Sequence, residues 1–356
     1  MNIKPLRVAV WSTGWIGSIA VQTIARRPDL DLAGVWVHSP EKAGQDAGVL
    51  TGGEALGVIA TNDADALIAR HPDCVCYAAS DGGLNEGVFD DYVRFLEAGI
   101  NVVTVTTAGL VFPPSFEESH RVRLEKAARA GGATLYASGM EPGFAGDQLA
   151  LTLLTMSRSV TSVRAQEIFL YDQYPVTFMM FDVFGFGKPL SYTPIMSMPG
   201  VQAATWAPVV RMVAHGLGAE LDEVRETYER ELTPRELHVA AGVIEAGTVG
   251  AVRLQTIGVV DGRDAIVVEH VNRMAPDLAP HWATAARDGT YRILIDGDPS
   301  MQCEFVLGAS NETASAEGMV ATAMRIVNAI PAVCAAPAGL VSSLDLPLTL
   351  PRNALG

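Results

Sequence analysis

The chain has 356 residues, of which 49% are hydrophobic and 18% charged, and its mean hydropathy is +0.23. This composition excludes an intrinsically disordered chain and gives enough length for about two globular domains. The formal net charge of −15 argues against nucleic acid and anionic membranes as partners, so a bound phosphate must be held by local geometry and a few cations.

The N-terminal part of the chain alternates between strand-like and helix-like segments. Its hydrophobic patterns predict strands at 7–11, 32–37, 74–79, 101–105 and 134–136. They predict helices at 17–27, 64–69, 89–99 and 116–130. Strands separated by helices of this length indicate an α/β fold with a Rossmann-type, doubly wound parallel sheet.

The pattern changes after Gly143 and predicts a second, α+β domain. Its predicted strands are 160–170, 251–258, 265–270 and 291–295, and its predicted helices are 147–156, 201–215 and 235–244. A further helix is expected at 313–330, followed by a tail rich in Ala, Pro and Leu. We place the domain boundaries at 1–145 for dinucleotide binding, 146–312 for the α+β domain and 313–356 for the last helix and tail.

The four cysteines, Cys74, Cys76, Cys303 and Cys334, do not have the spacing of zinc ligands. We therefore expect no metal site, and we interpret the cysteines as buried thiols of a reduced, cytoplasmic protein. An uninterrupted apolar run of about 20 residues does not occur, so no membrane span is expected.

The turn after the first predicted strand is the strongest motif. A strand, a glycine turn and a helix in this order direct backbone N–H groups and the positive helix end at one point, where a pyrophosphate binds. The motif is a degenerate G-x-G-x-x-G, because Ser12 and Ala20 stand where its first and last glycines are expected. A generic strand–helix connection is the alternative. The predicted cofactor-binding residues here are Ser12, Thr13, Gly14, Trp15, Ile16 and Gly17.

In such a fold, residues at the end of the second strand contact the adenosine ribose of the cofactor. Here His38 and Ser39 follow the strand directly, without the Asp or Glu that an NAD site usually carries, and Lys42 is near. A hydroxyl and a cation suit a 2′-phosphate, so we expect NADP, with NAD possible. The alternative is that Lys42 is a solvated loop charge.

Further candidates lie along the carboxyl edge of the sheet and in the second domain. Ala79, Ser80 and Thr106 follow two predicted strands and are expected to contact the cofactor. Candidates for the proton donor or acceptor are Glu141, Thr107, Tyr171 and Asp172. A substrate pocket lined by Met140, Phe178, Met180, Phe181 and Phe184 is predicted, with a plain hydrophobic core as the alternative.

Seven segments spread along the chain resemble the dihydrodipicolinate reductase-like family that includes 2,4-diaminopentanoate dehydrogenase and the native amine dehydrogenases. They are STGWIG at 12–17, SPEKAGQDAG at 39–48, NVVT at 101–104, GMEPGF at 139–144, FGFG at 184–187, VNAIP at 327–331 and DLP at 345–347. The resemblance implies a Rossmann domain, a substrate domain and a C-terminal helix that returns to the first domain. It also implies a homodimer and NAD(P)-linked interconversion of a carbonyl or imine with an alcohol or amine.

One departure from the family affects the expected reaction. Its amine dehydrogenases carry a glutamate a few residues after the NVVT strand, which handles the amine, whereas this chain has Thr107 or Ala108 there. We therefore expect an oxidoreductase that interconverts a small apolar carbonyl or imine with its alcohol or amine. The alternatives are an amine dehydrogenase with a relocated acid and a non-catalytic NADP-binding protein. Asn328, on the returning helix, is a candidate cofactor contact.

Overall fold

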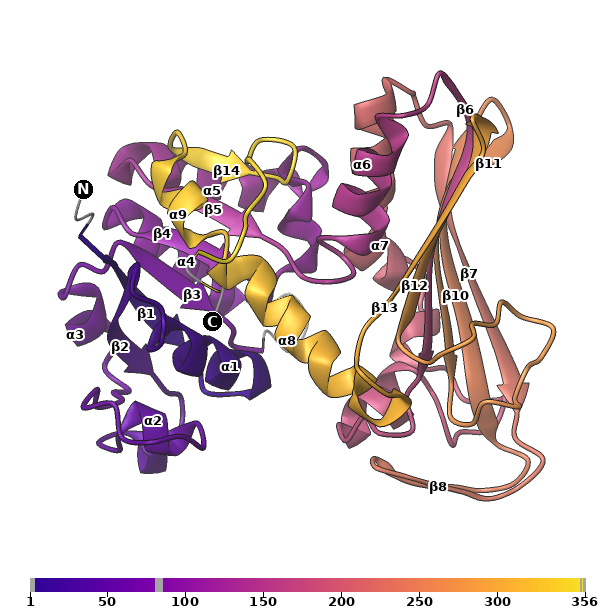
Figure 1. Ribbon diagram of the computed structural model, residues 1–356, viewed down its shortest axis with the longest axis horizontal. Helices are drawn as coiled ribbons and strands as arrows, with labels where there is room; N and C mark the ends of the chain where they lie inside the picture. Colours follow the sequence, from indigo (N-terminus) through magenta and orange to yellow (C-terminus); the bar gives the residue numbers. More distant parts are fainter. Residues whose placement is uncertain (1–3, 81–85, 353, 355–356) are drawn as a thin grey trace. The chain divides into compact units, whose positions relative to one another are not determined.

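The computed structural model describes residues 4–80, 86–352 and 354 (Figure 1). The chain forms two compact units. Unit 1 combines Met1–Gly143 with Met319–Gly356, and unit 2 is Phe144–Gly318. The boundaries expected after residues 145 and 312 lie a few residues from these.

Unit 1 is built on a six-stranded sheet in which every pairing is parallel. Its strands are β1 (Leu6–Trp11), β2 (Leu30–Trp36), β3 (Cys74–Tyr77), β4 (Asn101–Thr104), β5 (Thr134–Ala137) and β14 (Gly339–Val341). Their order is β14-β5-β4-β3-β1-β2, so β2 lies on one side of β1 and β3 on the other. This reversal of strand order is the switch point at which doubly wound sheets bind ligands, and the glycine turn directly follows β1.

Helices cover both faces of this sheet. They are α1 (Trp15–Ile24), α2 (Ala47–Leu50), α3 (Ala64–Ile68), α4 (Glu86–Glu97), α5 (Glu118–Gly131), α8 (Ala314–Val327, from Met319 in unit 1) and α9 (Ile330–Ala335). Val21 of α1 and Ile330 of α9 join a core cluster with Val8 and Val10 of β1. Trp11 lies on the other face, where its ring meets Phe95 of α4 edge-on at 4.8 Å. The predicted doubly wound sheet and the returning helix are confirmed.

The segment 311–335 is long and apolar enough to cross a membrane, with a mean hydropathy of 1.5. The structure interrupts it, because α8 ends at Val327 and α9 begins at Ile330. Ile326, Val327, Ile330 and Val333 are fully buried in the core of unit 1. These four residues therefore belong to the core of the Rossmann unit, whereas Val320 of the same segment is 44% exposed.

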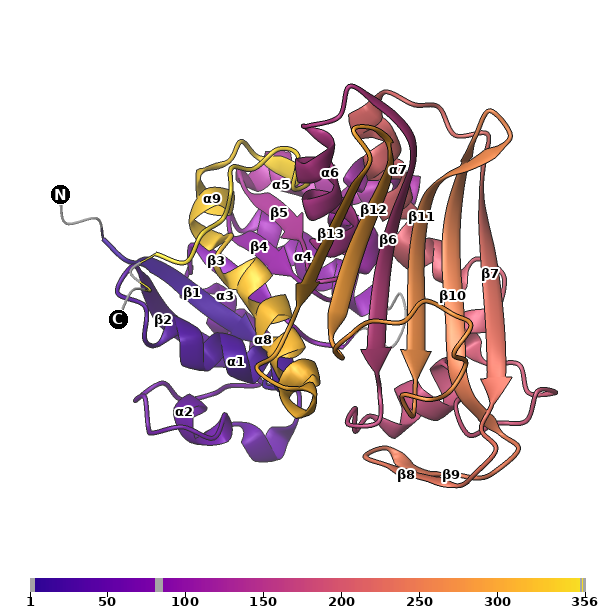
Figure 2. The same ribbon diagram turned by 45° about the vertical axis from the view of Figure 1, so that its right-hand side comes forward.

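Unit 2 is a six-stranded mixed sheet with two helices. Its strands are β6 (Ser159–Leu170), β7 (Glu223–Leu232), β10 (Val249–Val260), β11 (Arg263–Arg273), β12 (Thr290–Asp298) and β13 (Met301–Val306). Figure 2 shows them side by side in the order β13-β12-β6-β11-β10-β7. All pairings are antiparallel except β11 with β6. The helices are α6 (Ala150–Leu154) and α7 (Val201–Leu217).

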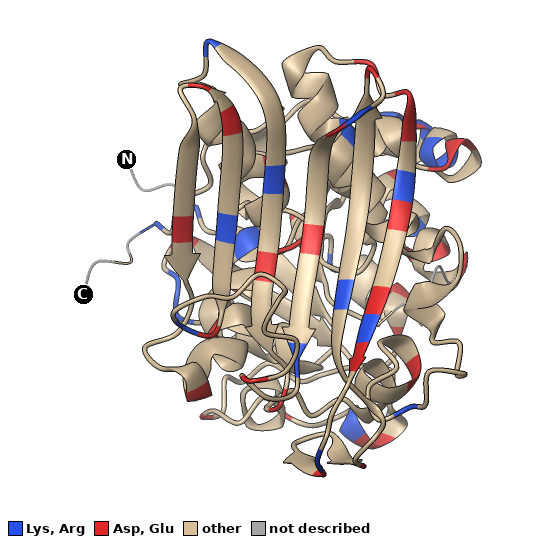
Figure 3. Cartoon of the chain, turned by 90° about the vertical axis from the view of Figure 1, so that its right-hand side faces the viewer, with Lys and Arg blue, Asp and Glu red and all other residues tan. Residues whose placement is uncertain are grey.

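The two faces of this sheet differ. Trp206 of α7 packs on His270 of β11 with ring centroids 4.3 Å apart, so residues in register with His270 lie beneath α7. We call this the inner face. Residues in register with Glu269 lie on the opposite, outer face, and Figure 3 colours the charged residues along the strands of this sheet.

The predicted helix at 235–244 is wrong. The segment forms a two-stranded hairpin of β8 (Leu237–Val239) and β9 (Gly242–Ile244). Gly242 adopts a φ of +144°, and a Cβ at this position would lie 3.2 Å from the ring of Phe181. Glycine therefore allows both the backbone conformation and the close approach of the ring, and these tertiary demands override the helical pattern.

Candidate functional site

The glycine turn after β1 has the geometry of a phosphate cradle. Ser12 adopts a φ of +96°, a region that favours glycine, at the position where the motif has its first glycine. A Cβ on Gly17 would lie 2.1 Å from the carbonyl oxygen of Ser12, so only glycine fits there. A Cβ on Gly14 would meet nothing closer than the Ser12 hydroxyl at 3.8 Å. A methyl group at Gly14 would therefore make no close contact with the protein.

The N-terminus of α1 lies at this turn. Its N-cap is Gly14, which has no capping side chain, and its first turn holds no acidic residue. The amide N–H groups of the first turn and the positive end of the helix dipole are therefore available to an anion. Ser18 Oγ donates to the carbonyl oxygen of Thr13 at 3.2 Å and holds the turn in place. These residues fit a pyrophosphate.

A cation lies beside the turn, as the NADP prediction requires. Lys42 ends a short 3-10 turn after Ser39, and its Nζ donates to Thr13 Oγ1 at 3.4 Å. His38 is exposed, with its ring 6.0 Å from that of Trp36 at the end of β2. Lys42, 29 positions from Thr13 in sequence, is thus brought next to the glycine turn by the fold.

The loops after β3 and β4 are tied to each other at the same edge of the sheet. Thr106 Oγ1 donates to the carbonyl oxygen of Ala79 at 2.6 Å, while Ser80 is exposed. Thr107 is 2% exposed, and its hydroxyl is 3.1 Å from that of Tyr92. Thr107 is therefore buried where the two loops pack together. The described residues 105–111, which follow β4, include no Asp or Glu.

The structure places Asn328 away from the cradle. Asn328 accepts a hydrogen bond from Arg27 at 2.8 Å, just beyond the C-terminal end of α1. The ten residues of α1 correspond to roughly 15 Å between that end and Gly14. Asn328 lines a groove of about 690 Å³ along α1, together with Trp15 and Met324. Met140 is buried and Glu141 half-buried in the loop after β5.

Unit 2 contains a buried carboxylate at the centre of a polar network on the inner face. Glu167 of β6 is 8% exposed. Its Oε1 accepts from the hydroxyl of Tyr171 at 2.8 Å and from Asn272 Nδ2 at 3.3 Å, and it lies 3.3 Å from His270 Nδ1. Its Oε2 accepts from the hydroxyl of Tyr291 at 3.2 Å. Tyr171, one of the predicted proton-transfer residues, is thus bonded to a glutamate that the sequence analysis did not single out.

The protonation of this pair follows from its surroundings. Burial alone would raise the pKa of Glu167, but the charge of His270 and the hydrogen bonds from His270, Tyr171 and Asn272 hold it below its usual value. Burial and the charge of Glu167 raise the pKa of Tyr171 well above its usual value. At neutral pH the pair is therefore an ionised carboxylate and a neutral phenol.

The remaining candidates of unit 2 are spread over different environments. Asp172 accepts from Gln173 Nε2 at 3.0 Å and is half-buried. Met180 and Phe184 are buried, whereas Phe178 is 58% exposed. The ring of Phe181 packs against Gly187 and Gly242. The ring of Phe184 lies 5.8 Å from the ring of Tyr171, so this predicted pocket residue contacts a predicted proton-transfer residue.

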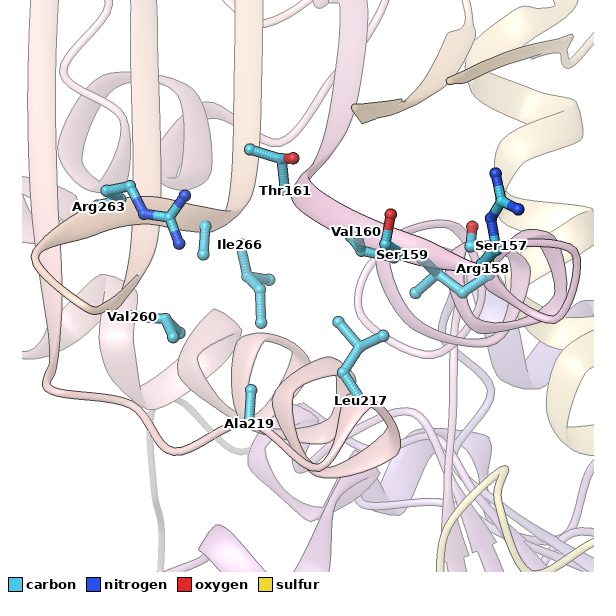
Figure 4. Close-up of a pocket in the computed structure, with 12 residues that line it drawn as sticks. Ser157, Arg158, Ser159, Val160, Thr161, Leu217, Ala219, Val260, Arg263 and Ile266 are labelled. Carbon is cyan, nitrogen blue, oxygen red and sulfur yellow. The ribbon is translucent and has the colours of Figure 1, made fainter. Parts of the chain in front are cut away.

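A separate pocket of about 320 Å³ lies at the far end of β6 (Figure 4). Its walls are apolar at Leu217, Val260 and Ile266, and Figure 4 shows the Arg263 guanidinium pointing into it. The lining includes none of the predicted site residues. A cluster of three or more possible metal ligands does not occur in the described ranges 4–80, 86–352 and 354.

Glu167 and His270 had a signal in the sequence that was not used. Both lie in predicted strands, at positions in step with the apolar residues of one face, Val163 and Ala165 on β6 and Ile266 and Val268 on β11. A charged residue at a buried strand position must be paired, which marks a polar site or a structural ion pair.

Comparison with known proteins agrees with this geometry. The family model of the 2,4-diaminopentanoate dehydrogenase C-terminal domain matches residues 144–355. The chain is 36% identical over 361 residues to an amine dehydrogenase of Streptomyces virginiae, covering 99% of this chain and 98% of that protein. It is 21% identical over 305 residues to the 2,4-diaminopentanoate dehydrogenase of Acetoanaerobium sticklandii, covering 82% and 80% of the two chains.

Among solved structures, the amine dehydrogenase from Mycobacterium smegmatis shares the fold, with a TM-score of 0.77 at 19% identity over 98% of this chain and 97% of that one. The predicted resemblance is confirmed, and the reading as a non-catalytic protein is set aside. This chain belongs to the family of 2,4-diaminopentanoate dehydrogenase and the amine dehydrogenases, and it is an NAD(P)-dependent oxidoreductase.

Proposed function

We propose that this oxidoreductase is an amine dehydrogenase, which interconverts an apolar ketone and ammonia with the corresponding primary amine. The observation that carries the proposal is the 36% identity to an amine dehydrogenase over nearly the whole of both chains. This favours the alternative with a relocated acid over reduction of a carbonyl to an alcohol. The buried carboxylate of Glu167 in unit 2 supports it, because the loop after β4 in unit 1 carries Thr107 where the acid is expected.

Within unit 1, residues of the glycine turn would hold the cofactor. The amides at the N-terminus of α1 would bind the pyrophosphate, and Gly14, which has no side chain, would let it approach. Lys42, beside Thr13, supports a preference for NADP, because its ammonium group would pair with a 2′-phosphate. When bound, the nicotinamide supplies the reducing equivalents for the substrate carbon.

The assembly proposed with this function is a homodimer through the outer face of the sheet of unit 2. Glu229, Arg253, Glu269 and Arg164 form a row of alternating charge on that face, with 3.0, 2.6 and 3.0 Å between successive partners. A two-fold rotation about the centre of the row places each charge opposite one of the other sign in a second copy.

The function is tested by following oxidation of NADPH and of NADH with a series of apolar ketones, with and without ammonium chloride. We expect turnover that depends on ammonia and is faster with NADPH. Turnover of the same rate without ammonia would instead identify a carbonyl reductase.

In the same assay, Lys42→Ala is expected to raise the KM for NADPH about tenfold, the effect of losing about 1.4 kcal/mol, and to leave the KM for NADH unchanged. Lys126→Ala, on the exposed surface of α5, is the matched control.

A further inference from the structure

Reductive amination requires the enzyme to bind a cationic nitrogen. A ketone and an ammonium ion combine to an iminium ion with loss of water, and reduction of the iminium carbon gives the amine. Ammonium and iminium nitrogens carry hydrogen atoms and positive charge, so a protein group that binds them must accept hydrogen bonds. A group that binds a carbonyl oxygen must donate one. The direction of a single hydrogen bond therefore distinguishes the two kinds of substrate.

The hydroxyl of Tyr171 is held as a hydrogen-bond acceptor for a ligand by its neighbour Glu167. Its hydroxyl hydrogen is committed to Glu167 Oε1 at 2.8 Å, because an ionised carboxylate has no hydrogen to give. The raised pKa of Tyr171 keeps the phenol protonated, so the bond does not reverse. The remaining lone pair of the Tyr171 hydroxyl oxygen is thus an acceptor, strengthened by the negative charge behind it.

Glu167 is itself fixed on all sides. His270, Asn272 and Tyr291 reach the carboxylate from β11 and β12, while Tyr171 follows β6, which carries Glu167. Four donors from three strands hold the carboxylate in one position and one charge state. The direction of the Tyr171 hydroxyl is therefore a property of the sheet rather than of a flexible side chain.

Aromatic rings surround the same hydroxyl-bearing ring. Phe169, Tyr174 and Phe184 lie 6.4, 5.8 and 5.8 Å from the ring of Tyr171. Aromatic faces attract cations and provide an apolar wall for alkyl substituents. An acceptor backed by a carboxylate and bordered by aromatic rings matches an organic ammonium ion better than a neutral polar molecule.

We propose that the Tyr171 hydroxyl oxygen binds the cationic nitrogen of ammonium or of an apolar primary amine, and that Glu167 is the positioning residue that sets the direction of this hydrogen bond. The inference rests on the proposed function and adds to it a group of unit 2 that binds the nitrogen. No proton is transferred in this step, and His270, Asn272 and Tyr291 act by holding Glu167.

The test compares Tyr171→Phe and Glu167→Gln with the full-length wild-type protein. Both variants are expected to raise the KM for ammonia at least tenfold, with kcat at saturating ammonia reduced less and NADPH affinity unchanged. Tyr228→Phe is the matched control, because it removes another inner-face phenol, which donates to the carbonyl oxygen of Phe184. If Glu167→Gln does not fold, Tyr171→Phe decides the question, since it keeps the ring. A wild-type KM for ammonia in Tyr171→Phe overturns the proposal.

A binding measurement separates this inference from the proposed function. Calorimetric titration with sec-butylammonium chloride is expected to show binding that Tyr171→Phe weakens at least tenfold, and no comparable binding of 2-butanol. If this holds while wild-type turnover ignores ammonia, the proposed function fails and the amine site stands. If turnover depends on ammonia while both variants bind sec-butylammonium as tightly as the wild type, the function stands and the assignment of Tyr171 and Glu167 fails.

Discussion

At the scale of single residues, the two glycines of the turn have different tasks. Gly17 is required by the chain itself, since a Cβ would overlap the Ser12 carbonyl oxygen at 2.1 Å. Gly14 is not required by the chain, because a Cβ there would make only an ordinary contact with the Ser12 hydroxyl at 3.8 Å. Its missing side chain matters to whatever approaches the N-terminus of α1.

This difference predicts opposite results for two alanine variants. Gly14→Ala is expected to keep the wild-type Tm and to weaken NADPH binding at least tenfold, because its methyl group occupies the space of the pyrophosphate. Gly17→Ala is expected to lower the stability of unit 1 by about 1–3 kcal/mol, the usual cost of overpacking, and to weaken NADPH binding as well. Thermal unfolding and fluorescence titration with NADPH measure both. Unchanged NADPH affinity in Gly14→Ala would remove the cradle from the site.

Sequence reasoning reached the turn but not the polar network of unit 2. Ser12, Gly14 and Gly17 are neighbours in the chain, so their spacing alone carries the motif. Glu167 and His270 are brought together by the pairing of β6 with β11, more than a hundred residues apart. No local sequence pattern encodes that register. The one local signal is that Glu167 and His270 each stand on the apolar face of their strand, which indicates that both side chains are buried.

At the scale of elements, α7 depends on a residue from a neighbouring strand. Its N-cap is Gly200, which has a φ of +84° and no side chain to accept from the first turn. Glu226 of β7 takes over this role, since its carboxylate accepts from the amides of Gly200, at 2.9 Å, and of Ala203. The negative charge also complements the positive end of the helix dipole.

We therefore expect Glu226→Ala to lower the free energy of unfolding of unit 2 by about 1 kcal/mol, as loss of a helix cap does. Glu226→Gln keeps an acceptor but loses the charge, and its loss of stability should be smaller. Urea unfolding at neutral pH measures both variants. Glu223→Ala, on the same strand and exposed, serves as the control. Equal stability of Glu226→Ala and Glu223→Ala would show that α7 does not need this cap.

The same scale shows why some elements were predicted and others were not. The strands of unit 1 have short apolar patterns bounded by turns, and the predicted ones were found close to their expected positions. The hairpin at 237–244 carries a pattern compatible with a helix, and the ring of Phe181 against Gly242 selects the hairpin. Strand β14 lies in a tail rich in Ala and Pro and exists because β5 offers an edge for parallel pairing.

At the scale of the whole molecule, the outer face of the sheet of unit 2 carries charges of both signs, so it need not repel the same face of a second copy. Glu269 is 2% exposed at its side chain, between Arg164 and Arg253. Burial alone would raise its pKa, but the hydrogen bond from Gln166 and the charges and bonds of Arg164 and Arg253 hold it below its usual value. The row therefore keeps its alternating charges at neutral pH. A flat face of paired charges can stack on its own copy without leaving a charge unpaired.

The proposed dimer makes a prediction about Leu294, which is half-buried on the outer face next to Arg164 in register. Leu294→Arg adds a long cation beside Arg164 and is expected to convert a dimer into a monomer, because its charge has no partner in the row and its length keeps the second sheet from packing against this face. Met156→Arg, at a position of unit 2 that is 59% exposed, is the matched control and should remain dimeric. Sedimentation velocity at micromolar concentration measures the assembly, and thermal unfolding checks that each variant is folded. A folded Leu294→Arg variant that sediments as a dimer would place the interface elsewhere, since an uncompensated cation in a tightly packed sheet-to-sheet contact costs more than such an interface can absorb.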